Sequence, residues 1–228
     1  MEIVLVRHGQ PEWVKDDLNV DNPPLTALGF RQAELVGRAL EKQHFDEVWV
    51  SPLLRAQQTA APLLQMLDLP LGEESTQAWL EEIRNPLWHG TPREKADAAY
   101  QEERNRPAEK RWDGLQDGEP VRDFVERIHS GANSFLLDRG ITRSAQQLPV
   151  WNIEKPERSI LLIAHAGTNS VFINHMLGLT PTPWEWERFV IAHASINRLS
   201  SYEIGDGHTF GLTKLSDVEH LHADERTY

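Results

Sequence analysis

Short runs of branched apolar residues occur at three places in the chain, residues 3–6, 48–50 and 159–164. Runs of this kind, without alternating polar residues, are typical of strands buried on both faces of a sheet. Apolar residues recur at helical spacing over 28–40, from 51 to about 67 and from about 168 to 177. Strands that alternate with helices predict an α/β fold, which we expect to be a three-layer sandwich with a mostly parallel central sheet.

The ends of several elements carry local signals. Thr26 is placed to cap the first of these helices. Ser51 and Pro52 predict a helix that starts directly after the second strand, with the serine as its cap. A short strand is also expected over 69–74. Residues 140–158 lack periodicity, and we interpret them as a long surface loop.

The region from about 79 to 139 differs from the alternating pattern on either side of it. It predicts two helices, over 92–104 and from about 118 to 136, and we expect them to form a helical insertion, or lid, over the active site. The last forty residues predict two or three strands with a hairpin turn at Gly205-Asp206-Gly207. Because no repeat or flexible linker interrupts the chain, we predict a single domain over 1–228.

Composition narrows the possible partners. The formal net charge is −12, so the surface repels nucleic acids and anionic membranes, and neither is expected as a partner. Cysteine is absent, which excludes disulfides and thiolate chemistry. The sequence also lacks the pattern of a signal peptide, and its apolar runs are too short to span a bilayer. We therefore expect a cytoplasmic protein, and leave its oligomeric state open.

Cationic and imidazole side chains follow the predicted strands. Arg7 and His8 come directly after the first strand, Arg55 lies in the first turn of the helix after the second, and His165 follows the third. Ligands of open α/β sheets bind beyond the carboxyl ends of the strands. If the three strands are parallel neighbours, two arginines and two histidines meet in one pocket, where guanidinium groups can bind a phosphate through paired hydrogen bonds.

The segment Leu5-Val6-Arg7-His8-Gly9-Gln10 resembles the Arg-His-Gly signature of the histidine phosphatase superfamily, which has the phosphoglycerate mutase-like fold. Other segments resemble that family's motifs in the same order: Pro24-Leu25-Thr26-Ala27-Leu28-Gly29, Ser51-Pro52-Leu53-Leu54-Arg55-Ala56-Gln57-Gln58-Thr59-Ala60, Leu80-Glu81-Glu82-Ile83, Gly118-Glu119 with Arg127, and Ile163-Ala164-His165-Ala166-Gly167. The resemblance extends from Glu2 to about Leu199.

This resemblance implies a phosphatase that acts on small phosphate monoesters through a phosphohistidine intermediate. His8 would be the nucleophile, Glu82 the proton donor, and Arg7, Arg55 and His165 the groups that offset phosphoryl charge. No cofactor and no metal is expected, because these cationic and imidazole groups provide the charge stabilisation. The implied substrate-binding residues are Arg7, His8, Gln10, Arg55, Glu82, His165 and Ala166.

The sequence departs from the family pattern mainly near the rim of the expected pocket. Val14 stands where many members have an asparagine, which leaves Gln10 as the nearest alternative polar group. Ala166 replaces a glycine beside His165. His193 is a further, weaker candidate. Possible rim contacts are Arg84, Trp88 and Arg93.

Two other functions stay open at this point. A mutase would move the phosphoryl group between two hydroxyls of one small molecule instead of releasing inorganic phosphate. A noncatalytic phosphate-binding module would keep the fold without the reaction, since a fold alone does not determine activity. The sequence does not identify which phosphate ester would be the substrate.

Overall fold

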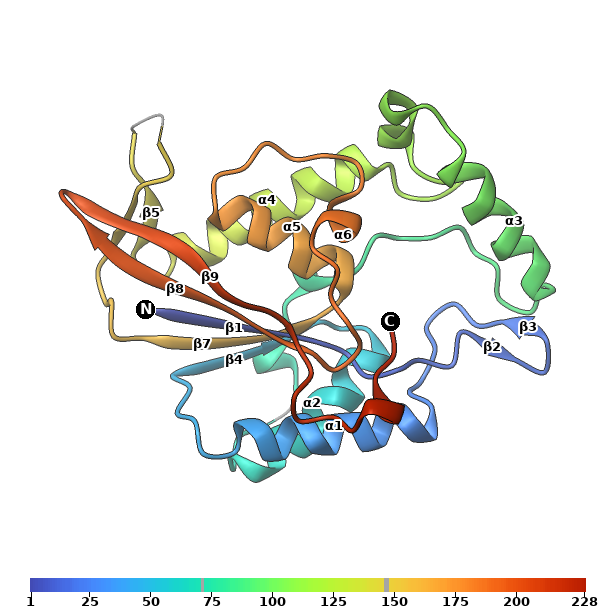
Figure 1. The fold of residues 1–228 in the computed structure, drawn as a ribbon, viewed down its shortest axis with the longest axis horizontal. Coiled ribbons are helices and arrows are strands. Elements are labelled where there is room, and N and C mark those ends of the chain that lie inside the picture. Colours follow the sequence, from blue (N-terminus) through green and yellow to red (C-terminus); the bar gives the residue numbers. More distant parts are fainter. Residues whose placement is uncertain (71, 146–147) are drawn as a thin grey trace.

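The computed structural model describes residues 1–70, 72–145 and 148–228. Its centre is a seven-stranded sheet in the order β4-β7-β1-β8-β9-β6-β5, with β2 and β3 pairing separately (Figure 1). The strands are β1 (Glu2–Arg7), β2 (Val14–Lys15), β3 (Leu18–Asn19), β4 (Glu47–Val50), β5 (Ile141–Arg143), β6 (Trp151–Ile153), β7 (Ser159–Ala164), β8 (Ile196–Ile204) and β9 (Gly207–Asp217).

The sheet is mixed. Strands β4, β7 and β1 are parallel neighbours, as the sequence predicted for the segments that carry the candidate site. The remaining pairings are antiparallel, from β1–β8 to β5–β6. The expected mostly parallel arrangement therefore describes only this part of the sheet. The reason is local: β8 and β9 are joined by a tight turn between Ile204 and Gly207, and a short hairpin connects only antiparallel strands.

Helices lie on both faces of the sheet (Figure 1). Helices α1 (Ala27–Leu40) and α2 (Leu54–Met66) pack on one face, and α4 (Val121–Leu137) and α5 (Ala166–Met176) pack on the other. The apolar run of β1 supplies both interfaces. Ile3 and Leu5 are buried on the α4–α5 side, whereas Val4 and Val6 are buried on the α1–α2 side. This two-sided burial explains why β1 shows no polar alternation.

Two further helices belong to the segments discussed below. Helix α3 (Arg93–Arg104) stands away from the body of the molecule, and α6 (Glu185–Arg188) follows α5 (Figure 1). Helix α3 buries only Ala96 and Glu103. Its first turn contacts the β2–β3 hairpin, where the Arg93 N–H donates to the Asp17 carbonyl over 3.0 Å. That residues 79–139 act as a lid stays a prediction. No helix in the described ranges is long and apolar enough to cross a membrane.

Two predictions of local structure were wrong. The described residues of 69–74 contain no strand; Glu73–Ser75 forms a turn of 3₁₀ helix instead, and residue 71 lies outside the described ranges. Residues 140–158 contain β5 and β6 rather than only a loop, with 146–147 outside the description. Strands of three residues are too short to show periodicity. They form because Ile141 and Trp151 are buried in the core cluster beneath α4 and α5.

Candidate active site

His8 lies directly beyond β1 and is 3 % exposed. Its Nδ1–H donates to the backbone carbonyl of Gly9 over 2.7 Å, which leaves Nε2 with its lone pair. The Nε–H of Arg55 donates to that Nε2 over 3.2 Å. Burial, and then the charge of Arg55, hold the pKa of His8 well below its usual range. His8 is therefore a neutral imidazole whose Nε2 carries the lone pair and accepts from Arg55.

The backbone around His8 extends the parallel ladder. The His8 N–H donates to the Ala164 carbonyl of β7, and the Ser51 N–H donates to the Ile163 carbonyl, each over 3.0 Å. The chain then turns at Gly9, where a Cβ would lie 2.5 Å from the Gly29 carbonyl oxygen. Glycine is required here because the backbone of the loop passes so close to the start of α1.

Arg55 and Arg7 are the cations of the site. Arg55, in the first turn of α2, is 3 % exposed, and the ring of Trp13 lies 4.8 Å from its guanidinium carbon. Arg7 donates through Nη1 to the Ile191 carbonyl over 2.6 Å and through Nη2 to His193 Nε2 over 2.9 Å. Burial lowers the pKa of each arginine to about 10, and the charge of Glu82 opposes that effect. Both guanidiniums stay ionised at neutral pH.

His165 precedes α5 and is fully buried, with its ring centroid 5.0 Å from that of His8. Burial, followed by the charges of Arg55 and Arg7, holds the pKa of His165 well below its usual range. Its Nε2 lies 2.7 Å from the Ser51 hydroxyl. The prediction that Ser51 caps the following helix was wrong, since α2 begins at Leu54 after Leu53. Ser51 still pairs with β7, and its hydroxyl contacts His165 while accepting the Leu53 N–H over 3.3 Å.

Glu82 approaches the same region from the loop before α3. Its carboxylate accepts the Gly167 N–H over 2.9 Å and the Ile83 N–H over 3.0 Å. A Cβ on Gly167 would lie 2.4 Å from a Glu82 oxygen, so glycine is needed for this contact. Arg127 stabilises this loop. Its guanidinium donates to the Glu82 carbonyl over 3.2 Å and pairs with Glu119 over 2.8 Å.

Two buried nitrogen atoms of the site, Arg7 Nε and His165 Nδ1, have no hydrogen-bond partner within the described parts of the chain. Buried polar atoms are nearly always paired in folded proteins, because leaving them unpaired costs free energy. Both side chains belong to the group that surrounds His8. Unpaired donors here are what a site for an anionic ligand requires.

His193 belongs to the site more closely than the sequence indicated. Its ring centroid lies 5.7 Å from that of His8, and its Nε2 accepts from Arg7. On the other side, His193 Nδ1 lies 2.9 Å from the Thr227 hydroxyl, which also accepts from Gln32 over 3.1 Å. Burial lowers the pKa of His193 to about 3. No local pattern indicated Thr227, because its contact with His193 joins segments far apart along the chain.

The other candidates lie around this centre. Gln10 accepts from the Thr26 hydroxyl over 2.8 Å, and Thr26 caps α1 as predicted. Ala166 is the first residue of α5. Val14 pairs with Asn19 in the β2–β3 hairpin. The three proposed rim residues have partners of their own: Arg84 pairs with Glu81, Arg93 with Asp97, and Trp88 packs edge-on against Tyr100.

Tyr100 was missed at the level of sequence. It lies on α3, and its hydroxyl is hydrogen-bonded to Asn85. Burial raises its pKa to about 12, and the charge of Glu82 acts in the same direction. Tyr100 therefore interacts electrostatically with the Glu82 carboxylate. Over the described ranges, no three His, Asp or Glu side chains are arranged to hold a metal ion.

Together these groups suit a tetrahedral anion. Two guanidiniums and a second imidazole lie around a neutral imidazole, and the Glu82 carboxylate is held beside the segment that carries His165. Guanidinium groups bind phosphoryl oxygens through paired, charge-assisted hydrogen bonds. Phosphoryl transfer depends mainly on positioning and on stabilising the charge of those oxygens. The arrangement is thus competent for attack on a phosphate ester.

Similar proteins include enzymes of phosphate ester chemistry. Phosphoserine phosphatase 1 of Hydrogenobacter thermophilus is 28 % identical over 131 residues, which are 56 % of this chain and 61 % of that protein. A 2,3-bisphosphoglycerate-dependent phosphoglycerate mutase of Methylorubrum populi is 44 % identical over 87 residues, 36 % of this chain and 37 % of the mutase. The match spans less than two thirds of either relative's length.

The fold is shared with solved structures. A mycobacterial glucosyl-3-phosphoglycerate phosphatase, in complex with inorganic phosphate, superposes with a TM-score of 0.68 at 22 % identity, covering 97 % of this chain and 99 % of that one. A structure named mycobacterial hydrolase 2 gives a TM-score of 0.71 at 22 % identity, covering 98 % and 93 %. The model of the histidine phosphatase superfamily (branch 1) matches residues 3–209. The chain therefore belongs to the histidine phosphatase superfamily.

Proposed function

We propose that this protein is a phosphatase that hydrolyses small phosphate monoesters through a phosphohistidine on His8. The observation that carries the proposal is the state of the His8 ring. Its Nδ1–H donates to the Gly9 carbonyl, and its buried Nε2 accepts from the Nε–H of Arg55. An imidazole fixed in this tautomer is ready to use Nε2 as a nucleophile.

In the first step the Nε2 lone pair forms a bond to phosphorus while the ester P–O bond breaks. Arg7 and Arg55 offset the negative charge of the phosphoryl oxygens. If the Ser51 hydroxyl donates to His165 Nε2, the other ring nitrogen carries a proton and can donate to the same oxygens; this nitrogen is the one without a partner. Glu82, in its protonated form, gives its proton to the leaving alkoxide.

In the second step water attacks the phosphohistidine. Glu82 is then a carboxylate and takes the proton from the attacking water while the P–N bond breaks. The products are inorganic phosphate and a neutral His8, so the cycle closes without a net change in the protein. The contacts of Glu82 with Gly167 and Ile83 support this role, since they hold the carboxylate beside the segment that carries His165.

The test is to trap the intermediate. A substrate with a ³²P-labelled phosphoryl group, quenched within milliseconds, is expected to label the wild type at a site that is stable to base and labile to acid. Mapping by mass spectrometry is expected to place the label on His8. His8→Ala should remove the label and lower kcat by about a thousandfold or more. The matched control is His44→Ala, because His44 is an exposed histidine at the opposite end of the sheet.

A second function, phosphoryl transfer between two hydroxyls of one molecule, is favoured by the likeness to the Methylorubrum mutase. The two reactions differ in their products. Hydrolysis releases inorganic phosphate and alcohol in equal amounts. An isomerised phosphoester without free phosphate would instead establish the mutase reaction, and an unlabelled His8 with full turnover would overturn both mechanisms.

A further inference from the structure

The entrance to the phosphate site is faced by aromatic side chains. Trp13 lies over the guanidinium of Arg55 and is 40 % exposed. Tyr100 comes from α3 and interacts electrostatically with both Glu82 and Arg55. Trp88 packs edge-on against Tyr100, with ring centroids 5.5 Å apart. Trp13 therefore lies beside the Arg55 guanidinium, and the buried ring of Trp88 supports Tyr100.

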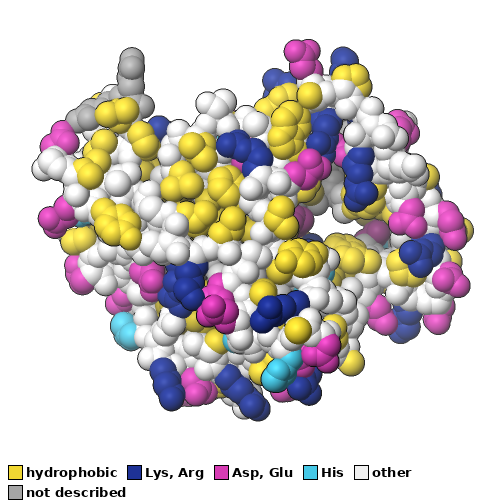
Figure 2. Space-filling model, in the orientation of Figure 1, with side chains coloured by type: hydrophobic (Ala, Val, Ile, Leu, Met, Phe, Trp, Pro, Cys, Tyr) yellow, Lys and Arg dark blue, Asp and Glu magenta, His cyan; other side chains and the backbone are white. Residues whose placement is uncertain are grey.

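Exposed aliphatic side chains lie on segments that also carry residues of the site. Leu87 is 87 % exposed on the loop that contains Asn85, the hydrogen-bond partner of Tyr100. Val190 is half exposed and directly precedes Ile191, whose carbonyl holds Arg7. Figure 2 shows a hollow between the segment that carries α3 and the body of the molecule, with hydrophobic side chains along its edge. Apolar groups exposed next to a polar pocket mark a ligand-binding surface.

The charged groups at the entrance are already paired with one another. Arg84, two residues after Glu82, donates to Glu81 over 2.8 Å, and Arg127 is tied to Glu119. The loop also passes Asp21, whose carboxylate accepts the Trp88 N–H over 3.0 Å. A second anionic group on a substrate would meet these carboxylates, and it would compete with them for the arginines. The net charge of −12 acts in the same direction.

From these observations we propose that the substrate is a monophosphate ester whose alcohol part is uncharged and presents a ring or other apolar face to Trp13, Tyr100 and Leu87. This inference rests on the proposed phosphatase function and concerns the same site. Arg7, Arg55 and His165 around His8 bind the phosphoryl group. The alcohol part of the ester packs against Trp13, Tyr100 and Leu87. Esters that carry a carboxylate or a second phosphate are poor substrates, because Arg84 and Arg127 are already paired with Glu81 and Glu119.

Matched substrate pairs test the charge preference. sn-Glycerol 1-phosphate and 3-phospho-D-glycerate have the same configuration at the central carbon and differ only in a hydroxymethyl group against a carboxylate. Phenyl phosphate and 4-carboxyphenyl phosphate differ only in the ring carboxylate, which makes the phenol a better leaving group, so intrinsic reactivity runs against the expected result. We expect kcat/KM to be at least about tenfold higher for the uncharged member of each pair. Equal values, or a preference for the carboxylates, would overturn the inference.

Substitutions at Leu87 test whether this residue contributes to the preference for uncharged esters. Leu87→Lys places a cation at the entrance and is expected to raise kcat/KM for 4-carboxyphenyl phosphate severalfold while lowering it for phenyl phosphate. Leu137→Ala and Leu87→Ala form a matched comparison, because Leu137 is 61 % exposed near the end of α4, far from His8 in sequence and outside the entrance. Only Leu87→Ala is expected to raise KM for phenyl phosphate. Equal effects of the two would contradict the assignment of this surface.

The same experiment separates this inference from the proposed function. If the wild type forms phosphohistidine on His8 but prefers carboxylated esters, the substrate class is wrong and the phosphatase function stands. If no ester in the set gives phosphohistidine or free phosphate, the proposed function itself fails. Circular dichroism and the thermal midpoint of each variant establish that the fold is retained.

Discussion

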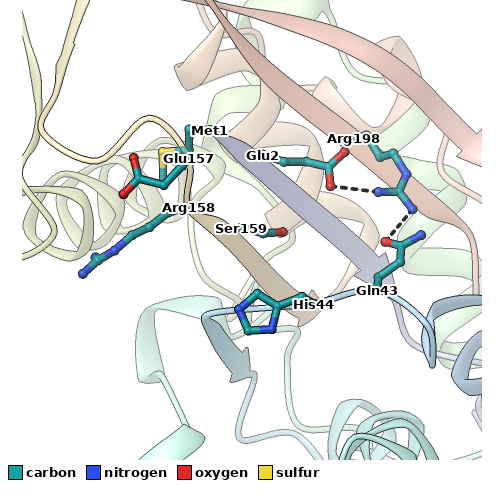
Figure 3. A pocket seen from close by; sticks show the side chains of 8 residues that line it. All are labelled: Met1, Glu2, Gln43, His44, Glu157, Arg158, Ser159 and Arg198. Carbon is teal, nitrogen blue, oxygen red and sulfur yellow. Dashed lines mark hydrogen bonds and ion pairs between the residues drawn. The ribbon is translucent and has the colours of Figure 1, made fainter.

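The two ends of the central strands contrast in how they hold charge. At the amino end of β1 and β7 a surface hollow is lined by eight residues, among them Glu2, Arg158 and Arg198 (Figure 3). There Arg198 pairs with Glu2 over 3.1 Å and bonds to Gln43 over 3.0 Å, and Arg158 lies 3.3 Å from Glu47. These cations have partners and lie near solvent.

At the carboxyl end Arg55 is buried and Arg7 half-buried, and their contacts are different. Arg7 and Arg55 contact backbone and imidazole groups, and neither forms an ion pair with a carboxylate within the described ranges. Burying a charge without a counter-ion is costly unless something supplies that counter-charge. A hollow at the surface therefore says less about function than a group of buried cations whose charge is left for a ligand to balance.

Replacing one arginine at each end of the central strands is expected to give the largest difference in activity. Arg55→Ala is expected to lower kcat/KM by roughly 100- to 1000-fold, the usual cost of removing one group that stabilises transition-state charge. Arg198→Ala, at the other end, is expected to change it by less than about twofold. Inorganic phosphate should raise the thermal midpoint of the wild type and of Arg198→Ala. The rise should be much smaller for Arg55→Ala. Equal losses in the two variants would remove the contrast.

Acid should weaken the fold through its buried histidines. The pKa of His193 is lowered to about 3 and that of His175 to about 4, in each case mainly by burial. A histidine whose folded pKa lies below its unfolded value of about 6.5 stabilises the protein above that value, and the contribution is lost as the pH falls towards the folded pKa. Each should cost about 2 kcal/mol of unfolding free energy between pH 7 and pH 5.

Denaturant unfolding at several pH values measures this loss. His193→Asn should make the decline between pH 6.5 and pH 5 shallower by about one bound proton. An unchanged slope in that variant would show that His193 is not held neutral by burial at the carboxyl end of the sheet.

A smaller effect tests how far the site extends. Thr227→Val removes the hydroxyl that contacts His193 while keeping the shape of the side chain. Because one hydrogen bond contributes about 1 kcal/mol, kcat/KM is expected to fall roughly fivefold through misplacement of His193 and Arg7. Thr227→Ser keeps the hydroxyl and should restore most of the activity. If both variants lose activity equally, the hydroxyl is not what positions His193.

Local sequence signals predicted the elements that carry the site well. Residues 159–164 match β7, and Thr26 caps α1 as expected. The runs that became β1 and β7 were recognisable because burial on both faces demands continuous apolar residues. The antiparallel part of the sheet was harder to predict. Its strands β5 and β6 are short, and they are stabilised by Ile141 and Trp151 packing into a core that the sequence does not display.

For the site, amino-acid order was sufficient to indicate which groups meet, since His8, Arg55 and His165 all follow neighbouring parallel strands or the helix attached to one. Side-chain contacts between segments far apart in the sequence could be identified only from the tertiary structure. Ser51 proved to be the partner of His165 rather than a helix cap, and Thr227 contacts His193 from a position 34 residues further along the chain. Strand ends are set by local patterns, whereas side-chain partners depend on which surfaces pack together. That packing is a property of the whole fold.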